Sequence, residues 1–325
     1  MSSTASPVSN DPPIYPSTPS RPIMVGIVGD SAAGKTTLTD GIVNVFGADR
    51  VTAICTDDYH RYDRNQRKGM SITPLHPDCN YMGTMEQHLL LLSAGEPILK
   101  PIYDHRNGSL IAPELVEPKK IVVVEGLLAY HTKRMRDCFD IKVYLDPPED
   151  LRRRWKIARD CAKRGYEPAQ VIADLERRES DSATFIRPQR EAADVVVRFH
   201  PPGPSTEVDP ASLAVRLVLR PTLPHPYLLE IADKTRINHY QPIRLSLARD
   251  HGRPVDFLEV ESGIPPELSA IVERIVWDNI ALHDNHLDRE AIGLFQDGDL
   301  VRRSESLALA QLLLVGQLAS AWATI

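Results

Sequence analysis

Residues 24–37, which read MVGIVGDSAAGKTT, constrain the fold of this chain more than any other stretch. An apolar run leads into a loop of small residues, whose spacing from Gly29 to Thr36 matches the phosphate-binding pattern G-x-x-x-x-G-K-[ST]. The apolar run predicts a buried strand, and the periodicity of residues 36–46 predicts a helix. The alternative is a glycine turn with an incidental lysine and no role in binding, but the strand and helix predicted around the motif argue against it.

The residue types in this loop suit the binding of a phosphorylated ligand. Glycines allow backbone N–H groups to approach phosphates, Lys35 adds a positive charge, and the Thr36 hydroxyl can ligate Mg²⁺. The N-terminus of the following helix also favours an anion. The candidate binding residues are Gly29, Asp30, Ser31, Ala32, Ala33, Gly34, Lys35, Thr36 and Thr37.

Two further predicted strands lead into carboxylates. Residues 51–56 run directly into Asp57, and residues 120–125 end at Glu125. Ligands of open α/β sheets bind beyond the carboxyl ends of the strands, so both carboxylates are placed where chemistry is expected. Glu125 is a candidate partner of Mg²⁺, with an ordinary salt bridge as the alternative.

Composition favours a globular protein and excludes several classes. The chain has 325 residues, of which 42% are hydrophobic, enough to bury a core. A net charge of −6 argues against bulk binding to nucleic acid. The four cysteines lack the spacing of a zinc site or a disulfide framework, so reduced thiols and a cytoplasmic location are expected. The apolar run at 307–318 is too short to cross a membrane and predicts a buried helix.

Two breaks in composition divide the chain. Residues 1–22, rich in Ser, Pro and Thr, predict a disordered arm without the features of a signal peptide or a membrane anchor. Residues 23–200 alternate strand and helix patterns, which is typical of a P-loop NTPase-type α/β fold with a mostly parallel sheet flanked by helices. Residues 201–210 predict a linker. Residues 211–325 predict a C-terminal antiparallel-sheet and helix extension, with strands at 213–219, 227–231, 243–247 and 255–260 and helices at 266–282 and 304–321.

Residues 149–164 predict an amphipathic helix that ends before Gly165. At about 100° per residue, the expected apolar stripe contains Leu151, Trp155, Ala158 and Ala162. The basic residues fall broadly on the other side and are Arg152, Lys156, Arg159, Lys163 and Arg164. This basic side would either close over phosphates as a lid or be a solvated charged face.

Residues 61–80 lack periodicity and carry several cations, which is typical of a mobile substrate loop. The cations follow Asp57 directly and favour a phosphorylated substrate, whereas a nucleoside would call for aromatic stacking. Further along, the Asn107-Gly108 pair predicts a hairpin turn.

Six segments follow one another in an order that is typical of one family of kinases. They are GDSAAGKTT (29–37), ICTDDYHRYDR (54–64), EPILKPIYDHRNG (96–108), IVVVEGL (121–127), WKIARDCAKRG (155–165) and IRPQREAADVVV (186–197). Together they resemble the phosphoribulokinase and uridine kinase family of P-loop kinases, and within it the longer plant, cyanobacterial and archaeal type of phosphoribulokinase. The first segment is shared by many nucleotide-binding proteins, whereas the second, third and fifth are much more specific.

The resemblance implies phosphorylation of the 1-hydroxyl of D-ribulose 5-phosphate, with ATP and Mg²⁺ as cofactors and a homodimer as the assembly. Asp57 matches the catalytic base of the family. The candidate substrate-binding residues are His60, Arg61, Arg64, Tyr103 and His105. Lys156, Arg159 and Arg164 match basic residues of phosphoryl transfer and the lid. With Lys35, the first two are candidate catalytic residues, and the last two are candidate nucleotide-binding residues.

Two alternatives stay open. A uridine kinase-like or other small-metabolite kinase of the same superfamily would share the loop and the fold. A non-catalytic ATP-binding scaffold would not need Lys35, Thr36, Asp57 and Glu125 to be intact together.

One departure from the family concerns regulation. Light-regulated members have a cysteine in the phosphate-binding loop, which forms a disulfide with a second cysteine. Cys55 resembles the second position, but the loop position is Ala33 in this chain. That disulfide therefore cannot form, and Cys55 is expected to be a small core residue.

Overall fold

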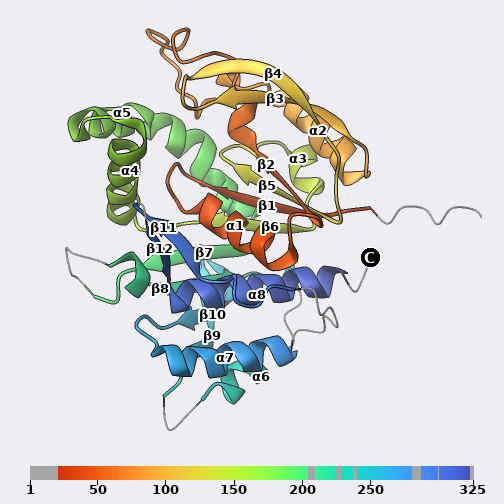
Figure 1. Ribbon diagram of the computed structural model, residues 1–325, viewed down its shortest axis with the longest axis vertical. Helices are drawn as coiled ribbons and strands as arrows, with labels where there is room; N and C mark the ends of the chain where they lie inside the picture. Colours follow the sequence, from red (N-terminus) through yellow and green to blue (C-terminus); the bar gives the residue numbers. More distant parts are fainter. Residues whose placement is uncertain are drawn as a thin grey trace, which may run out of the picture.

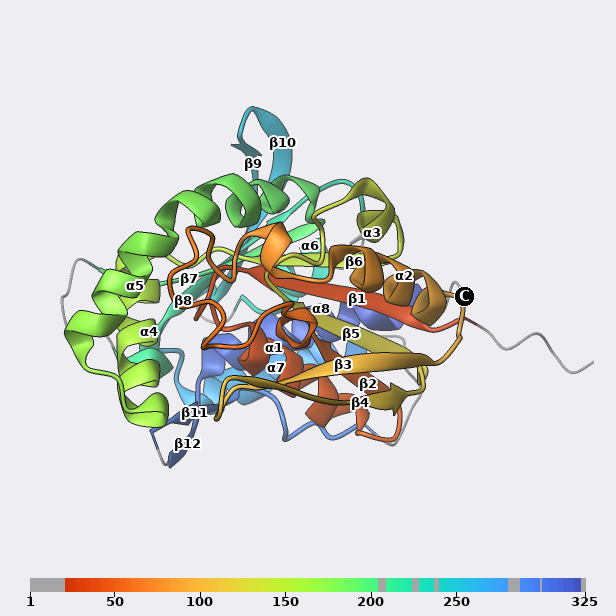
Figure 2. The ribbon, with the colours of Figure 1, turned by 90° about the horizontal axis from the view of Figure 1, so that it is seen from above.

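The computed structural model describes residues 21–203, 209–223, 228–236, 240–279, 287–298 and 300–322. Its centre is an eight-stranded sheet with the order β2-β5-β1-β6-β7-β8-β10-β9 (Figures 1 and 2). The first five strands of this order are parallel, and the last three continue the sheet in antiparallel pairs. The strands are β1 (Ile23–Gly29), β2 (Val51–Cys55), β5 (Ile121–Gly126), β6 (Ile141–Leu145), β7 (Val195–His200), β8 (Ala214–Leu219), β9 (Ile243–Asp250) and β10 (Arg253–Val260). The predicted fold class is confirmed.

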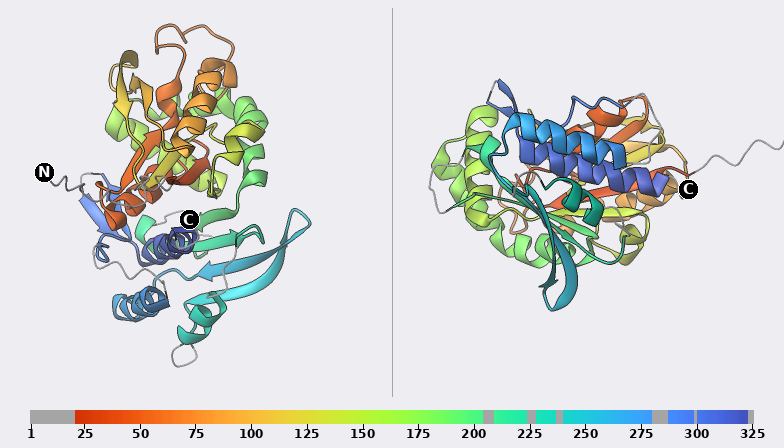
Figure 3. Two further views of the ribbon diagram at one scale, coloured as in Figure 1. Left: turned by 90° about the vertical axis from the view of Figure 1, so that its right-hand side faces the viewer. Right: turned by 90° about the horizontal axis from the view of Figure 1, so that it is seen from below.

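Helices cover both faces of the sheet, because successive side chains of a buried strand point in opposite directions. In β1, Val25 and Ile27 belong to one apolar core, and Met24 and Val28 belong to the other. The first core is closed by α1 (Lys35–Phe46), α6 (Leu228–Lys234), α7 (Pro266–Asn279) and α8 (Glu305–Trp322), and the second by α2 (Met82–Ser93) and α3 (Lys133–Asp137). Figure 3 shows α7 and α8 side by side. The predicted burial of residues 307–318 is confirmed.

Two smaller features lie at the carboxyl side of the parallel strands. The hairpin of β3 (Ile98–Asp104) and β4 (Ser109–Val116) turns at Gly108, whose φ is 71°, which confirms the predicted turn. The helix pair α4 (Glu149–Arg164) and α5 (Pro168–Asp181) lies at one end of the molecule (Figures 1 and 2). Short turns, η3 (Ser182–Ile186) and η4 (Arg187–Ala192), connect α5 to β7.

The predicted apolar stripe of α4 is only partly correct: Leu151 is buried in the first core and Trp155 packs against it. Ala158 and Ala162 are exposed, and three charged residues, Arg152, Lys156 and Asp160, are buried instead. These three residues are spaced by four, so they form one row along the helix. The row is buried because it faces other charged groups, as described for the site below.

The predicted strand at 227–231 is also wrong. Residues 228–234 form the helix α6, while residue 227 lies outside the described residues. Leu228, Ile231 and Ala232 are buried, and their spacing of three and four puts them on one side of a helix.

The proposed division of the chain stays a prediction. Residues 1–20 of the predicted arm and residues 204–208 of the predicted linker lie outside the described residues. On either side of the linker, β7 and β8 pair with each other in the central sheet. In the part of the chain that the structure describes, no helix combines the length and the apolar character needed to span a bilayer.

Candidate functional site

The carboxyl ends of three neighbouring strands bring the predicted carboxylates and the phosphate-binding loop together. β5 lies between β1 and β2, and Glu125 pairs in register with Ile27 on one side and Cys55 on the other. The loop begins directly after β1, and Asp57 lies two residues beyond Cys55 in the turn η1 (Thr56–Tyr59). Parallel strands that are adjacent thus place both groups at one edge of the sheet.

The phosphate-binding loop has a tightly defined backbone. A Cβ at Gly29 would lie 2.7 Å from the backbone oxygen of Leu145, so only glycine fits there. Gly34 has a φ of 97°, and Ala32 has a φ of 65°. A left-handed conformation costs a residue with a Cβ about 1–2 kcal/mol, so contacts elsewhere must hold Ala32 in place. The amino group of Lys35 donates to the backbone oxygens of Gly29 (3.0 Å) and Asp30 (2.9 Å).

Thr36 and Glu125 form the part of the site that suits a cation. The Thr36 hydroxyl lies 3.1 Å and 3.2 Å from the two carboxylate oxygens of Glu125. Burial raises the pKa of Glu125, although Lys35 and the Thr36 hydroxyl oppose that effect. A hydroxyl beside a carboxylate is the kind of oxygen pair that Mg²⁺ prefers. Among the described residues there is no cluster of three or more His, Cys, Asp or Glu that could hold a metal without further ligands.

Asp57 lies near basic side chains from three other parts of the chain. Burial alone would raise the pKa of Asp57, but the charges of His60, Lys35, His105 and Arg159 outweigh it and lower the pKa. Burial lowers the pKa of His60 and of His105, so both imidazoles are mostly neutral at neutral pH. Asp57 is therefore held as a carboxylate, the form that can accept a proton.

His60, Tyr103 and His105 lie together beside Asp57. The ring of Tyr103 meets the ring of His60 edge to face, with 4.9 Å between the centroids, and the ring of His105 at 5.0 Å. His60 is buried, and its Nδ1 donates to Asn80 Oδ1 at 2.8 Å. Arg67 donates to the Tyr103 hydroxyl. Arg67 is one of the cations that the sequence places after Asp57, whereas Asn80 was not singled out, because only the folded loop 61–80 brings it here.

The predicted arginines of this loop differ in their placement. Arg64 donates to the backbone oxygen of His105 at 2.6 Å, and its backbone N–H donates to Gly108 at 2.7 Å. A Cβ at Gly108 would lie 2.6 Å from the Arg64 side chain, so this glycine allows the close approach. Arg61 is exposed, and its guanidinium lies 5.7 Å from the ring centroid of Tyr62. The structure thus joins Arg64, but not Arg61, to the group around His105.

Two arginines of α4 lie near Asp57, and the buried row of the same helix lies beside them. Arg159 and Arg164 are close enough to Asp57 to interact with it electrostatically. Lys156 is 1% exposed, and its amino group donates to Asp160 at 2.6 Å. Burial lowers the pKa of Lys156 to about 8.

Asp160 is a residue that the sequence analysis missed. Its carboxylate accepts from Lys156, accepts from Arg159 at 2.9 Å, and lies 3.6 Å from Arg164. It is buried, and Lys156 and Arg159 lower its pKa against the effect of burial. The sequence contained a signal for this role: Lys156, Asp160 and Arg164 are spaced by four, and residues four apart lie on one side of a helix, where they can form ion pairs.

Comparison with known proteins gives a family and a fold. Residues 24–203 match the model of the Phosphoribulokinase / Uridine kinase family. A phosphoribulokinase of Synechocystis sp. is 40% identical over 198 residues, which are 61% of this chain and 60% of that protein. The chloroplastic phosphoribulokinase of Mesembryanthemum crystallinum is 37% identical over 199 residues, 56% of this chain and 50% of that protein. The chain therefore spans between half and three-fifths of the length of these relatives.

A uridine kinase of Listeria innocua is 32% identical over 181 residues, 54% of this chain and 87% of that protein. Among solved structures, the phosphoribulokinase from Rhodobacter spheroides is similar with a TM-score of 0.57 and 17% identity, covering 80% of this chain and 96% of that one. At this identity the likeness establishes the fold alone.

Proposed function

This chain belongs to the Phosphoribulokinase / Uridine kinase family, and on that basis we propose that it is an ATP-dependent kinase acting on D-ribulose 5-phosphate. The reaction would transfer the γ-phosphoryl group of ATP to the 1-hydroxyl and give ribulose 1,5-bisphosphate and ADP. The observation that carries the proposal is the carboxylate of Asp57, held ionised between Lys35 of the phosphate-binding loop and the His60–Tyr103–His105 group. The likeness to phosphoribulokinases supports the choice of substrate.

On the nucleotide side, the loop would bind phosphates through its backbone N–H groups and the amino group of Lys35. Thr36 and Glu125 would hold Mg²⁺, which when bound neutralises charge on the phosphates. Lys35 donates to two loop carbonyls in this structure, so its amino group already lies at the loop.

On the acceptor side, Asp57 would orient the hydroxyl and accept its proton. A carboxylate with a lowered pKa is fully ionised at neutral pH, so it is ready to accept. In phosphoryl transfer most of the acceleration comes from positioning and from neutralising charge, which fits a site with one base and several cations. Arg159 and Arg164, aligned by Asp160, would supply positive charge opposite Asp57.

The phosphate already present on the substrate needs cations at a distance from the reacting hydroxyl. Arg64 and Arg67 are the candidate cations, since they border the backbone of His105 and the Tyr103 ring, and the neutral imidazoles of His60 and His105 beside them can add hydrogen bonds. Arginine can bind a phosphate through two N–H groups at once. A nucleoside lacks such a phosphate, so this group favours the sugar phosphate over uridine.

The test is ADP release with Mg-ATP and a panel of acceptors: ribulose 5-phosphate, ribose 5-phosphate, xylulose 5-phosphate, uridine, cytidine and none. We expect turnover that strongly prefers ribulose 5-phosphate. Turnover with a nucleoside alone would favour the uridine kinase-like alternative. A rate no higher than without acceptor, combined with tight binding of ATP, would favour a scaffold.

We also propose a homodimer and a cytoplasmic location, both by analogy with the family. Light scattering during size-exclusion chromatography would test the assembly, and a mass of 36.3 kDa would contradict it.

A further inference from the structure

The side chain of Asp30, in the phosphate-binding loop, is turned toward α4 and η3. It is 7% exposed. One carboxylate oxygen accepts from the backbone N–H of Ser31 at 2.7 Å and lies 3.5 Å from the guanidinium of Arg152. The other accepts from the Ser182 hydroxyl. A carboxylate repels a phosphate, so this side chain acts on the loop itself.

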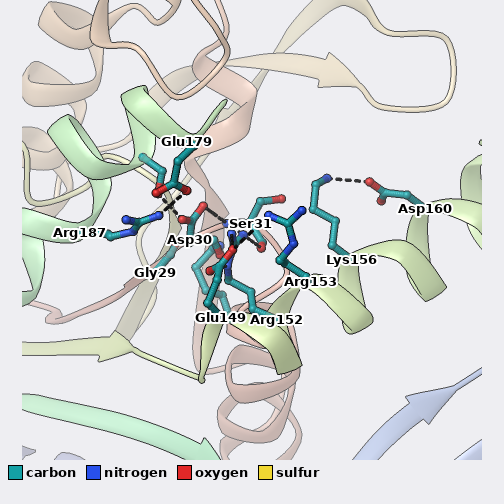
Figure 4. Close-up of polar contacts among 12 residues, drawn as sticks. Gly29, Asp30, Ser31, Glu149, Arg152, Arg153, Lys156, Asp160, Glu179 and Arg187 are labelled. Carbon is teal, nitrogen blue, oxygen red and sulfur yellow. Dashed lines mark hydrogen bonds and ion pairs between the residues drawn. The ribbon is translucent and has the colours of Figure 1, made fainter. Parts of the chain in front are cut away.

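Arg152, in the first turn of α4, reaches the same stretch of backbone (Figure 4). Its Nη1 donates to the backbone oxygen of Ser31 at 2.9 Å. Its other nitrogens donate to the two carboxylate oxygens of Glu149 at 2.8 Å and 2.7 Å, so the guanidinium is held in one orientation. Arg152 is only 5% exposed.

These contacts fix both peptide groups of Ser31. Asp30 holds the N–H, and Arg152 holds the C=O that belongs to the peptide bond with Ala32. The orientation of that peptide plane determines the φ of Ala32, which is 65° and unfavourable for a residue with a Cβ. Arg152 and Asp30 thus lie where a constraint on Ala32 is needed.

We propose that Arg152 is a positioning residue of the phosphate-binding loop: acting through Asp30 and the Ser31 carbonyl, it holds the loop in the form that receives the nucleotide phosphates. A loop that is already ordered loses less entropy when a ligand binds. Arg152 lies in the first turn of α4, and Ser182 directly follows α5. The contacts of both residues with Asp30 therefore connect the loop to the α4–α5 pair. The inference rests on the proposed binding of ATP.

The test is calorimetric titration with Mg-ADP, which needs no acceptor substrate. For Arg152→Met we expect affinity to fall roughly tenfold to a hundredfold, because a charged hydrogen bond to the loop is lost. Arg152→Lys should also lower the affinity for Mg-ADP, since an ammonium group cannot bind Ser31 and Glu149 at once with the fixed geometry of a guanidinium. The matched control is Arg154→Met, which removes an exposed pair with Asp150 on the same helix and should change affinity less than twofold.

A second comparison separates positioning from a general loss of structure. Glycine adopts a positive φ without a Cβ clash. The loss of Mg-ADP affinity caused by Arg152→Met should therefore be at least threefold smaller in a protein that carries Ala32→Gly than in the wild-type protein. The KM for ATP should rise, whereas the KM for the sugar phosphate should stay within twofold. If Arg152→Met does not fold, Ser182→Ala and Arg152→Lys carry the same test.

Unchanged Mg-ADP affinity in Arg152→Met, or no recovery with Ala32→Gly, would overturn the inference. If the wild-type protein bound no Mg-ADP at all, the proposed function would fail first, and that result is distinct from the others.

Discussion

The contact between Gly41 and Gln311 offers a sharp test of how the C-terminal helix supports the site. Gly41 lies in the middle of α1, the helix that follows the phosphate-binding loop, and a Cβ there would lie 2.1 Å from Nε2 of Gln311 in α8. Gln311 is fully buried. Its Nε2 donates to the backbone oxygen of Thr37 at 3.1 Å, and its Oε1 accepts from the N–H of Gly293 at 2.6 Å.

We expect Gly41→Ala to destabilise the protein by about 2–5 kcal/mol, because the new methyl group displaces a buried amide and unpairs its partners. For a chain of this size, that corresponds to a fall in Tm of roughly 5–10 °C. The matched control is Gly83→Ala in the first turn of α2, where no atom lies within 4 Å of the new Cβ. That variant should be neutral or stabilised by up to about 1 kcal/mol.

Chemical denaturation of the four proteins in a double-mutant cycle would measure the contact. Gln311→Ala alone is destabilising, since it leaves Thr37 and Gly293 without their partner, but it also removes the clash. The double variant Gly41→Ala with Gln311→Ala should therefore be more stable than the sum of the two single effects by at least ~1 kcal/mol. Additive effects, or a Gly41→Ala protein as stable as Gly83→Ala, would refute the reasoning.

Three further outcomes concern the chemistry. Asp57→Asn should lower kcat by about 10²–10⁴, because the amide cannot accept a proton, while Mg-ADP affinity measured by calorimetry stays within twofold; unchanged turnover would remove Asp57 as the base. Lys156 has a pKa of about 8 and carries its charge only below that pH, so kcat/KM for ATP should fall as pH rises, by about tenfold between pH 7 and pH 9. Lys156→Arg stays charged and should lose that fall, and an identical pH profile in both proteins would exclude Lys156 as its cause. Activity should be the same with and without dithiothreitol or reduced thioredoxin, because Ala33 replaces the regulatory loop cysteine and all four cysteines are free; several-fold activation would contradict this.

Features set by local sequence could be predicted closely. The strand, loop and helix around Gly29 follow from a fixed motif and from the periodicity of the residues beside it. The ends of α4 were predicted correctly, because Gly165 adopts a positive φ of 67° that ends the helix. The edge that joins Glu125 to the loop followed from a general property of parallel sheets.

Features set by distant partners could not be predicted. Asn80 and Arg67 reach His60 and Tyr103 only through the course of a loop that has no periodicity. Gln311 interrupts an apolar run in the sequence, yet in the structure it donates a hydrogen bond from α8 to the backbone of α1. Its role depends on Gly41, which is 270 positions away along the chain.

The buried charges of α4 show why apolar periodicity predicts only part of the inner side of such a helix. The buried guanidinium of Arg152 forms ion pairs with Asp30 and Glu149, and the buried amino group of Lys156 forms an ion pair with Asp160. Removing one partner of such a pair would leave a buried charge and cost about 3–5 kcal/mol, so the pairs fix the orientation of the helix strongly even where they add little net stability. Charges spaced by four usually mark a solvated face, and the sequence of α4 alone does not distinguish the two cases. The row is the inner side of the helix because it faces the phosphate-binding loop at Asp30 and residues of α5 such as Leu175 and Arg178, which the sequence of α4 does not encode.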